Sequence, residues 1–191
     1  MAYNICSDAL SNIGVQCGEN PQAGFTGRAI IGLKKNMSCT KDSNGDILTV
    51  TDTDMVLVDN VWANTMDGTQ ASLVTDNGRP QWHHDLGVRV PRVGNGITTR
   101  ETVKALAANP SWGIFEREDG TYLACGFNGK MIATAQTQAE NASAGDWVNT
   151  LGTDESTPET LFVDTPAVND TPAVPAKQKF NTMWQSIIEA A

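Results

Sequence analysis

The sequence lacks the features that mark several large classes of protein. It has only two histidines and four cysteines, and no two cysteines have the C-x-x-C spacing of zinc or redox sites. No stretch approaches the roughly 20 apolar residues of a membrane-spanning helix. The first residues lack the basic and apolar regions of a signal peptide. We therefore expect free thiols, no zinc or other cofactor, no membrane span, and a protein made and kept in a cytoplasm.

Basic residues are scarce. The chain has 13 Lys and Arg against 22 Asp and Glu, which gives a net charge of -9. A surface of this sign repels phosphate groups, so sequence-specific binding of nucleic acid is not expected.

The charges that are present are segregated along the chain. Between Lys41 and Arg79 there are seven acidic residues and no basic one, whereas five basic residues lie from Arg79 to Lys104. Residues 131–176 again contain seven acidic residues and no basic one. Solvated loops are one interpretation. The sharper one is complementary faces that meet when copies assemble head to tail, an arrangement that can close into rings.

Short strand-like segments separated by turns fill most of the chain. Hydrophobic residues make up 40% of the sequence, which is enough for a core. Asn44-Gly45, in the turn 43–46, predicts a type I′ hairpin, and Asp119-Gly120 a second hairpin. The pattern predicts a mainly β protein with flanking helices (α+β), whose body is a β-barrel or sandwich. Pro91 interrupts the strand-like segment 86–93, so we expect an edge strand there.

The sequence divides into three parts by composition and periodicity. Residues 1–140 form the β-rich body, with a short N-terminal helix near 7–13 and a helix at 98–108. Residues 141–176 are acidic and rich in Pro, Thr and Ala, with Asp-Thr-Pro-Ala-Val repeated, and predict an extended arm without a core of its own. Residues 177–191 form a C-terminal amphipathic helix.

Five apolar residues of this last helix recur at i, i+3, i+4, i+7 and i+8 and define one face. They are Phe180, Met183, Trp184, Ile187 and Ile188. A helix of about three turns is marginal alone, so this face must dock on something. The long tether makes a neighbouring subunit as reachable as the chain's own body, and these residues are our candidate subunit-docking interface. We expect deletion of 164–191 to weaken assembly more than folding.

Both histidines lie in one short motif, Gln-Trp-His-His-Asp-Leu at 81–86. Adjacent side chains of a strand point to opposite faces, so His83 and His84 would not converge on one metal ion. We therefore interpret His83, His84 and Asp85 as a polar loop or subunit contact, which histidine would make pH-sensitive. A hydrolase or metal enzyme that uses them is a less favoured hypothesis. We predict no catalytic, cofactor-binding or metal-binding residue.

Asp42-Ser-Asn-Gly-Asp46 imitates a calcium-binding loop. An EF-hand needs glycine at position 6 and glutamate at position 12. Here glycine is fourth and Thr53 is twelfth, so a turn is favoured.

The two stretches 5–17 (ICSDALSNIGVQC) and 24–36 (GFTGRAIIGLKKN) resemble the start of virion structural proteins from tailed phages of gut Bacteroidetes. These are tail-tube-like and tail-ring proteins, those of crAss-like phages included, and the resemblance covers about the first fifth of the chain. It implies a β-barrel or sandwich with a flanking helix, stacked in rings around a DNA channel, and brings no catalytic residues.

We therefore expect a non-enzymatic tail or head–tail connector component, located in the virion and assembled in the cytoplasm of the host bacterium. Its partners would be copies of itself and neighbouring tail or connector proteins, while DNA passes without sequence-specific binding. The alternative is a carbohydrate- or receptor-binding module on a virion surface, with an exposed platform drawn from the five tryptophans. Tryptophans are more often core or interface anchors.

Overall fold

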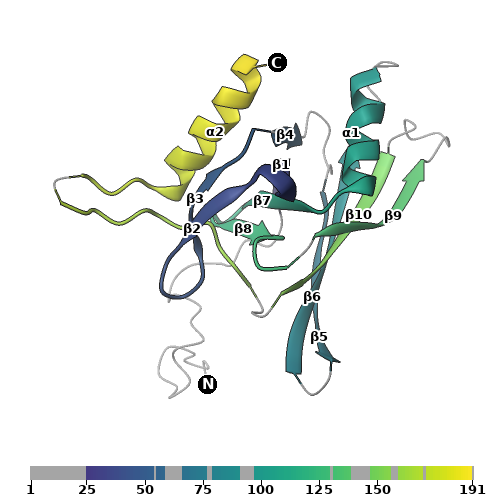
Figure 1. Ribbon diagram of the computed structural model, residues 1–191, viewed down its shortest axis with the longest axis horizontal. Coiled ribbons are helices and arrows are strands. Elements are labelled where there is room, and N and C mark those ends of the chain that lie inside the picture. Colours follow the sequence, from purple (N-terminus) through teal and green to yellow (C-terminus); the bar gives the residue numbers. More distant parts are fainter. Residues whose placement is uncertain are drawn as a thin grey trace, which may run out of the picture.

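The chain is mainly strands, as its sequence predicts. The computed structural model describes residues 25–53, 55–58, 66–76, 79–90, 97–129, 131–138, 147–155, 159–169 and 171–190. These residues form ten strands, one short 3-10 helix (Lys34–Asn36) and two α-helices (Figure 1). The expected N-terminal helix near 7–13 lies outside them.

The first sheet is antiparallel and has the order β4-β1-β7-β8. Its strands are β1 (Phe25–Leu33), β4 (Met55–Val58), β7 (Ser111–Arg117) and β8 (Tyr122–Cys125). The two central strands are apolar on both faces: neighbours such as Ile30 and Ile31 point to opposite sides, yet both are fully buried. A sheet of this kind needs a cover on each face.

A segment near the C-terminus widens this sheet. The amide of Phe162 donates to the carbonyl of Tyr122 on β8 at 2.8 Å, and on its other side the segment pairs with Ile47. Ile47 begins β3 (Ile47–Thr51), which forms a hairpin with β2 (Ser38–Lys41). The short segment 160–163 thereby joins the β2–β3 hairpin to the first sheet.

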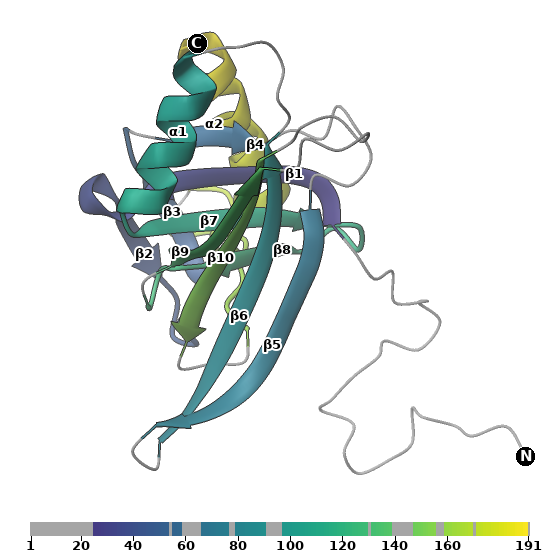
Figure 2. The same cartoon turned by 90° about the vertical axis from the view of Figure 1, so that its right-hand side faces the viewer.

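The second sheet has the order β5-β6-β10-β9 and is also antiparallel. Its strands are β5 (Met66–Asp76), β6 (Arg79–Val90), β9 (Ile132–Gln138) and β10 (Trp147–Glu155). It packs against one face of the first sheet, with helix α1 (Ile97–Ala108) beside it (Figure 2). The shared core consists of Ala29, Ile31, Leu86, Leu106, Phe115, Leu123, Cys125, Met131 and Leu151. The two sheets share this core, and the described strands do not close into a barrel.

Two expectations about this second sheet are wrong. Strand β6 lies between β5 and β10 and is not an edge strand. The described strand ends at Val90, and Pro91 lies outside the described residues. Strand β10 lies inside the range 141–176, which we expected to be an arm without a core. Leu151 of β10 is fully buried, so the body continues past residue 140.

Helix α2 (Ala176–Ala190) covers the other face of the first sheet. Phe180 is fully buried and its ring lies 4.9 Å from that of Tyr122 on β8, while Trp184 is 6% exposed. Met183 and Ile187 are partly buried against the same core, and Ile188 is 49% exposed.

The final helix therefore docks on its own chain. The sequence had left two alternatives open, this one and docking on a neighbouring subunit. Four of the five candidate docking residues contact this intramolecular core. Deletion of 164–191 would uncover that core and so weaken folding, which argues against our expectation that the deletion weakens assembly more than folding.

Replacing Trp184 with alanine tests this docking. We expect Trp184→Ala to lower the free energy of unfolding by about 3–5 kcal/mol, because it removes a buried aromatic side chain and leaves a cavity. Ile188→Ala on the same helix is the matched control and should cost less than about 1 kcal/mol, because half of that side chain is already exposed. Urea unfolding measures both. Equal effects of the two substitutions would contradict the docking.

Candidate functional site

The two histidines of β6 point to opposite faces of the second sheet, as the strand period predicts. His84 is 4% exposed and lies on the face that also carries the buried Leu86. His83 is half-buried on the other face, with Asp85 two residues further along the same strand. The structure therefore separates the two histidines and groups His83 with Asp85.

Strand β10 adds a third member to this group. In the pairing of β6 with β10, His83 stands opposite Asp154. Its Nδ1 lies 2.7 Å from a carboxylate oxygen of Asp154, and its Nε2 lies 3.3 Å from a carboxylate oxygen of Asp85. The hydrogen bond with Asp154 raises the pKa of His83 most, and the two negative charges raise it further, against a smaller opposing effect of burial.

This arrangement favours an ion pair over catalysis. Each ring nitrogen of His83 faces a carboxylate, so the protonated ring is stabilised and no nitrogen is left to accept a substrate proton or bind a metal ion. The Nε2 atom of His84 is buried without a hydrogen-bond partner, which costs free energy of folding. Because it is buried, a substrate cannot reach it. Among the described residues, no group of three or more His, Cys, Asp or Glu is arranged to hold a metal ion.

The calcium-like sequence 42–46 forms a turn, although not the type I′ turn we predicted. Gly45 has a φ of 93°, whereas a type I′ turn also needs a positive φ at Asn44. The Asp42 carboxylate accepts hydrogen bonds from the amides of Asn44 and Asp46, at 2.8 and 2.9 Å. Asp46 in turn accepts from the amide of Leu161 at 2.8 Å. Both carboxylates therefore accept hydrogen bonds from backbone amides.

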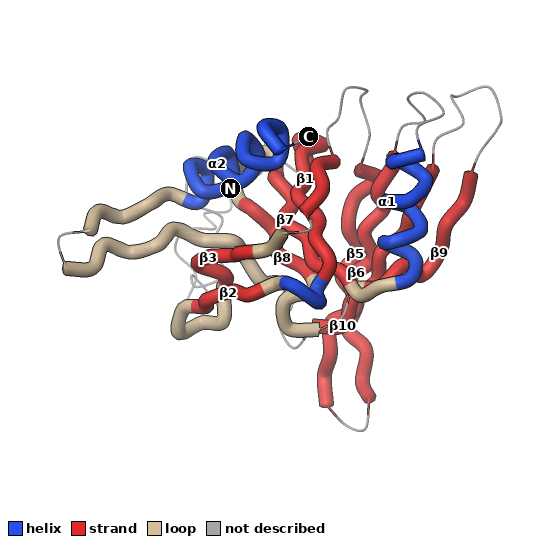
Figure 3. Tube along the Cα trace, turned by 45° about the horizontal axis from the view of Figure 1, so that its top comes forward, coloured by secondary structure: helices blue, strands red, loops and turns tan. Residues whose placement is uncertain are grey.

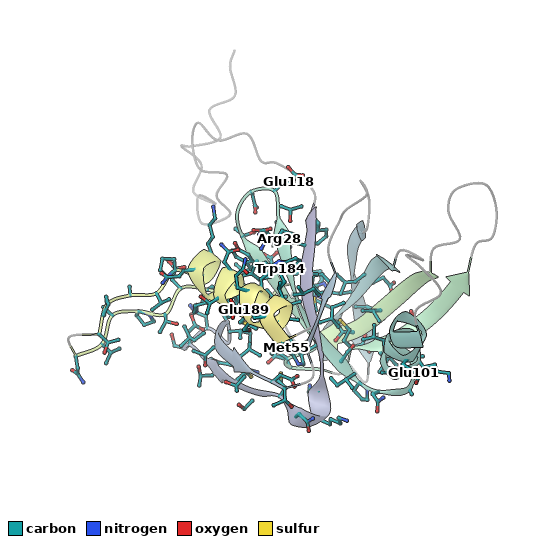
Figure 4. All side chains as sticks on the ribbon, turned by 90° about the horizontal axis from the view of Figure 1, so that it is seen from above. Arg28, Met55, Glu101, Glu118, Trp184 and Glu189 are labelled. Atoms are coloured by element: carbon teal, nitrogen blue, oxygen red, sulfur yellow. The ribbon has the colours of Figure 1, made fainter. Side chains whose placement is uncertain are left out.

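A polar cluster that sequence reasoning missed lies between β1, β7 and α2. The Arg28 guanidinium lies 4.4 Å from the ring centre of Trp184 and 5.2 Å from that of Phe180. It donates to Glu116 at 3.2 Å and to the side chain of Asn181 at 3.0 Å. Figure 4 shows Arg28 beside Trp184 at the sheet-facing side of the helix. Arg28 therefore connects the sheet to α2 by stacking and by charge.

Glu116 is the acceptor at the centre of this cluster and is buried. Its carboxylate also accepts from the hydroxyls of Thr26 at 2.9 Å and Tyr122 at 3.1 Å. Burial, followed by the nearby charge of Glu116, raises the pKa of the Tyr122 hydroxyl, which therefore stays a neutral donor. The cluster is satisfied by these partners and faces the helix, so we interpret it as structural.

Residues 164–175, which we call the arm, form a hairpin; residue 170 lies outside the description. Thr165 and Val174 exchange backbone hydrogen bonds of 2.9 and 3.0 Å, and Val168 and Thr171 exchange bonds of 3.1 and 3.0 Å. Asn169 at the tip has a φ of 41°, which a tight turn favours. The repeated Asp-Thr-Pro-Ala-Val sequence therefore pairs with itself, and the tandem repeat becomes the two sides of one hairpin.

The base of the arm is fixed to the body. The Asp164 carboxylate accepts a hydrogen bond of 2.7 Å from the amide of Ala176, the first residue of α2, and so caps the helix. Lys179 donates to the carbonyl of Val163 at 2.6 Å and to the hydroxyl of Thr165 at 3.0 Å. Burial lowers the pKa of this lysine. The arm and α2 are thereby oriented as one unit.

The tryptophans do not gather on one described surface. Trp112 is fully buried and donates to Asp52 at 2.7 Å, and Trp184 belongs to the α2 core. Trp82 is half-buried. Trp62 and the side chain of Trp147 lie outside the description. Of the cysteines, Cys39 and Cys125 form no disulfide, as expected, and the other two lie outside the described residues.

The partners that sequence reasoning missed come from other elements of the chain. Asp154 lies in the acidic stretch 141–176, which we expected to be an extended segment, and only strand register brings it opposite His83. Arg28 is the one charged residue in an otherwise apolar and small strand, 25–33, which is the one signal that could have marked it.

Comparison of the chain with protein-family models, with curated proteins and with solved structures found no match. No helix among the described residues combines the length and the apolar character that crossing a membrane requires.

A titration of His83 tests the ion-pair cluster. We expect its pKa to lie above the ordinary value of 6.5 and to fall toward that value in Asp154→Asn, because the strongest partner is lost. Since folding raises this pKa, the stabilisation is complete below pH 6.5 and is lost as the pH rises through the folded-state pKa. It should amount to less than about 1 kcal/mol, as for other exposed pairs.

NMR of the imidazole resonances measures this pKa directly. Glu101→Gln on helix α1 removes one carboxylate elsewhere and is the matched control. A His83 pKa that is the same in the wild type and in Asp154→Asn would contradict the cluster.

Proposed function

We propose that this protein is a non-enzymatic structural component of a tailed-phage virion, a tail or head–tail connector protein whose copies form a ring around a DNA channel. The observation that carries the proposal is a two-sheet body from which two β-hairpins extend beyond the core. One is the end of β5–β6 and the other is the arm (Figures 1 and 2). The resemblance of the N-terminal residues to tail-tube-like and tail-ring proteins agrees with it.

The end of β5–β6 extends past its neighbour in the sheet. The last pair between β6 and β10 joins Trp82 to Glu155, whereas β5 and β6 stay paired as far as Asp76 and Arg79. Two-stranded hairpins are marginal in water without further packing. Hairpins that extend from a stable body favour contacts with other molecules, and in a symmetric assembly these are other copies of the same chain.

The charge of the chain supports a channel for DNA. A net charge of -9 repels phosphate, so DNA could move past such a subunit without being held. The same property disfavours a protein whose task is to bind DNA.

The two competing functions receive less support. A hydrolase or metal enzyme at 81–86 would need an available imidazole, but His83 is engaged at both nitrogens and His84 is buried. A carbohydrate- or receptor-binding module would need exposed tryptophans, but Trp112 and Trp184 belong to the core.

Light scattering and electron microscopy of the purified full-length protein test the proposal. We expect a closed ring with a central channel, formed by the protein alone or together with its neighbouring virion proteins. The ring should not retain double-stranded DNA at physiological salt. A protein that stays monomeric with and without those neighbours would contradict the proposal.

A further inference from the structure

The chain contains the dipeptide Asn-Gly four times, and the structure describes two of these pairs, 44–45 and 128–129. The backbone nitrogen that follows an asparagine can attack the carbonyl carbon of the asparagine side chain, which releases ammonia. Glycine favours this reaction because it has no Cβ to hinder the approach and because its backbone reaches conformations that other residues avoid. The surroundings of each pair then decide whether it reacts.

Asn44 and Gly45 lie in open space at the turn between β2 and β3, which projects from the body (Figures 1 and 3). Asn44 is exposed and Gly45 has a φ of 93°. Apart from its chain neighbours, no atom of the described residues lies within 4 Å of the position that a Cβ of Gly45 would take. The reacting groups are held only by long hydrogen bonds to Asp42. The amide of Gly45 donates to its carbonyl at 3.3 Å, and Nδ2 of Asn44 donates to its carboxylate at 3.3 Å.

Asn128 and Gly129 are held more firmly. The side-chain oxygen of Asn128 accepts from Lys41, and its side-chain nitrogen donates to the hydroxyl of Thr160 at 3.3 Å. A Cβ at Gly129 would overlap the carbonyl oxygen of Asp154, so this backbone has no room to turn. The two pairs therefore have the same sequence and opposite freedom to react.

We propose that Asn44 is a site of spontaneous deamidation and that its conversion loosens the base of the arm. The backbone nitrogen of Gly45 attacks the side-chain carbonyl carbon of Asn44, the ring of a succinimide closes, and the side-chain nitrogen leaves as ammonia with the proton of the Gly45 amide. Water then opens the ring. Attack on the side-chain carbonyl gives aspartate, and attack on the main-chain carbonyl gives isoaspartate, in which the chain continues through the former side chain. The reaction needs no enzyme and no co-reactant other than water.

Both products weaken the turn. The side-chain amide that donates to Asp42 at 3.3 Å is replaced by a carboxylate, so a hydrogen bond gives way to the repulsion of two like charges. Isoaspartate also adds a carbon atom to the main chain inside the turn. The Asp42 carboxylate closes this turn by accepting from the amides of Asn44 and Asp46 at 2.8 and 2.9 Å, so a longer main chain displaces Asp46.

A displacement of Asp46 is transmitted to the base of the arm. The Asp46 carboxylate accepts from the amide of Leu161 at 2.8 Å. The next residue, Ile47, donates to the carbonyl of Leu161 at 2.8 Å and accepts from the amide of Val163 at 3.0 Å. The arm begins directly after Val163. Deamidation therefore loosens the segment 160–163 and, with it, the base of the arm, whether or not the copies form a ring.

Mass spectrometry of the full-length protein during storage tests the site. The protein is kept at neutral and at mildly alkaline pH, digested at intervals and mapped for the mass gain of deamidation, with fragmentation that separates isoaspartate from aspartate. We expect Asn44 to convert at least about tenfold faster than Asn128, because the side chain of Asn128 must first give up two hydrogen bonds. The rate at Asn44 should rise with pH, since the attacking amide must lose its proton. Equal rates at the two asparagines would overturn the site.

Hydrogen exchange of the stored protein tests the effect on the arm. Asn44→Gln is the matched control, because it keeps a side-chain amide whose larger ring closes much more slowly. We expect the amides of 161–165 to exchange about tenfold faster in the stored wild type than in the fresh protein, and to stay unchanged in stored Asn44→Gln. Conversion of Asn44 without faster exchange at 161–165 would overturn the link to the arm. Faster exchange in stored Asn44→Gln as well would show that deamidation is not its cause, and would also overturn that link.

Discussion

The first sheet has two apolar faces, and the rest of the structure follows from the need to cover both. Ile31 and Phe115 point toward the second sheet, and Ile30 and Ile114 point toward α2. Leaving either face in water would forfeit about 25 cal/mol for each Å² of apolar surface exposed. The chain therefore returns from the second sheet, adds the segment 160–163 to the edge of the first, and brings α2 onto the open face. The Arg28 cluster fixes the orientation of the helix once it is there.

This return path explains why the arm projects. Residues 160–163 are paired in the sheet and α2 is docked on it, so the residues between them must leave the body and come back. Repeated residues on the two sides let that excursion pair with itself as a hairpin. Its base is fixed where Asp164 caps the helix and Lys179 contacts the carbonyl of Val163. A segment whose composition is typical of a flexible linker thereby becomes an oriented projection, which is the property that a contact between subunits requires.

Local patterns in the sequence predict the secondary-structure elements, whereas the contacts between those elements depend on long-range strand register. Helices were predicted at 98–108 and 177–191, and the structure has them at Ile97–Ala108 and Ala176–Ala190. They were predictable because the spacing of apolar residues and the residues at helix ends are properties of the local sequence. The separation of His83 from His84 followed from the strand period alone. Strand β10 was missed because an acidic composition was interpreted as a boundary. The partners Asp154 and Glu116 depend on strand pairing, which no local pattern encodes.

The central claim is that α2 completes the core of its own chain, so that the arm is held rigidly by the body. Native-state hydrogen exchange measures this most directly. If the claim holds, the amides of α2 exchange as slowly as those of β1 and β7, because all three open only in the same global unfolding. Fast exchange throughout α2, while β1 and β7 stay protected, would show that the helix detaches independently and would contradict the account.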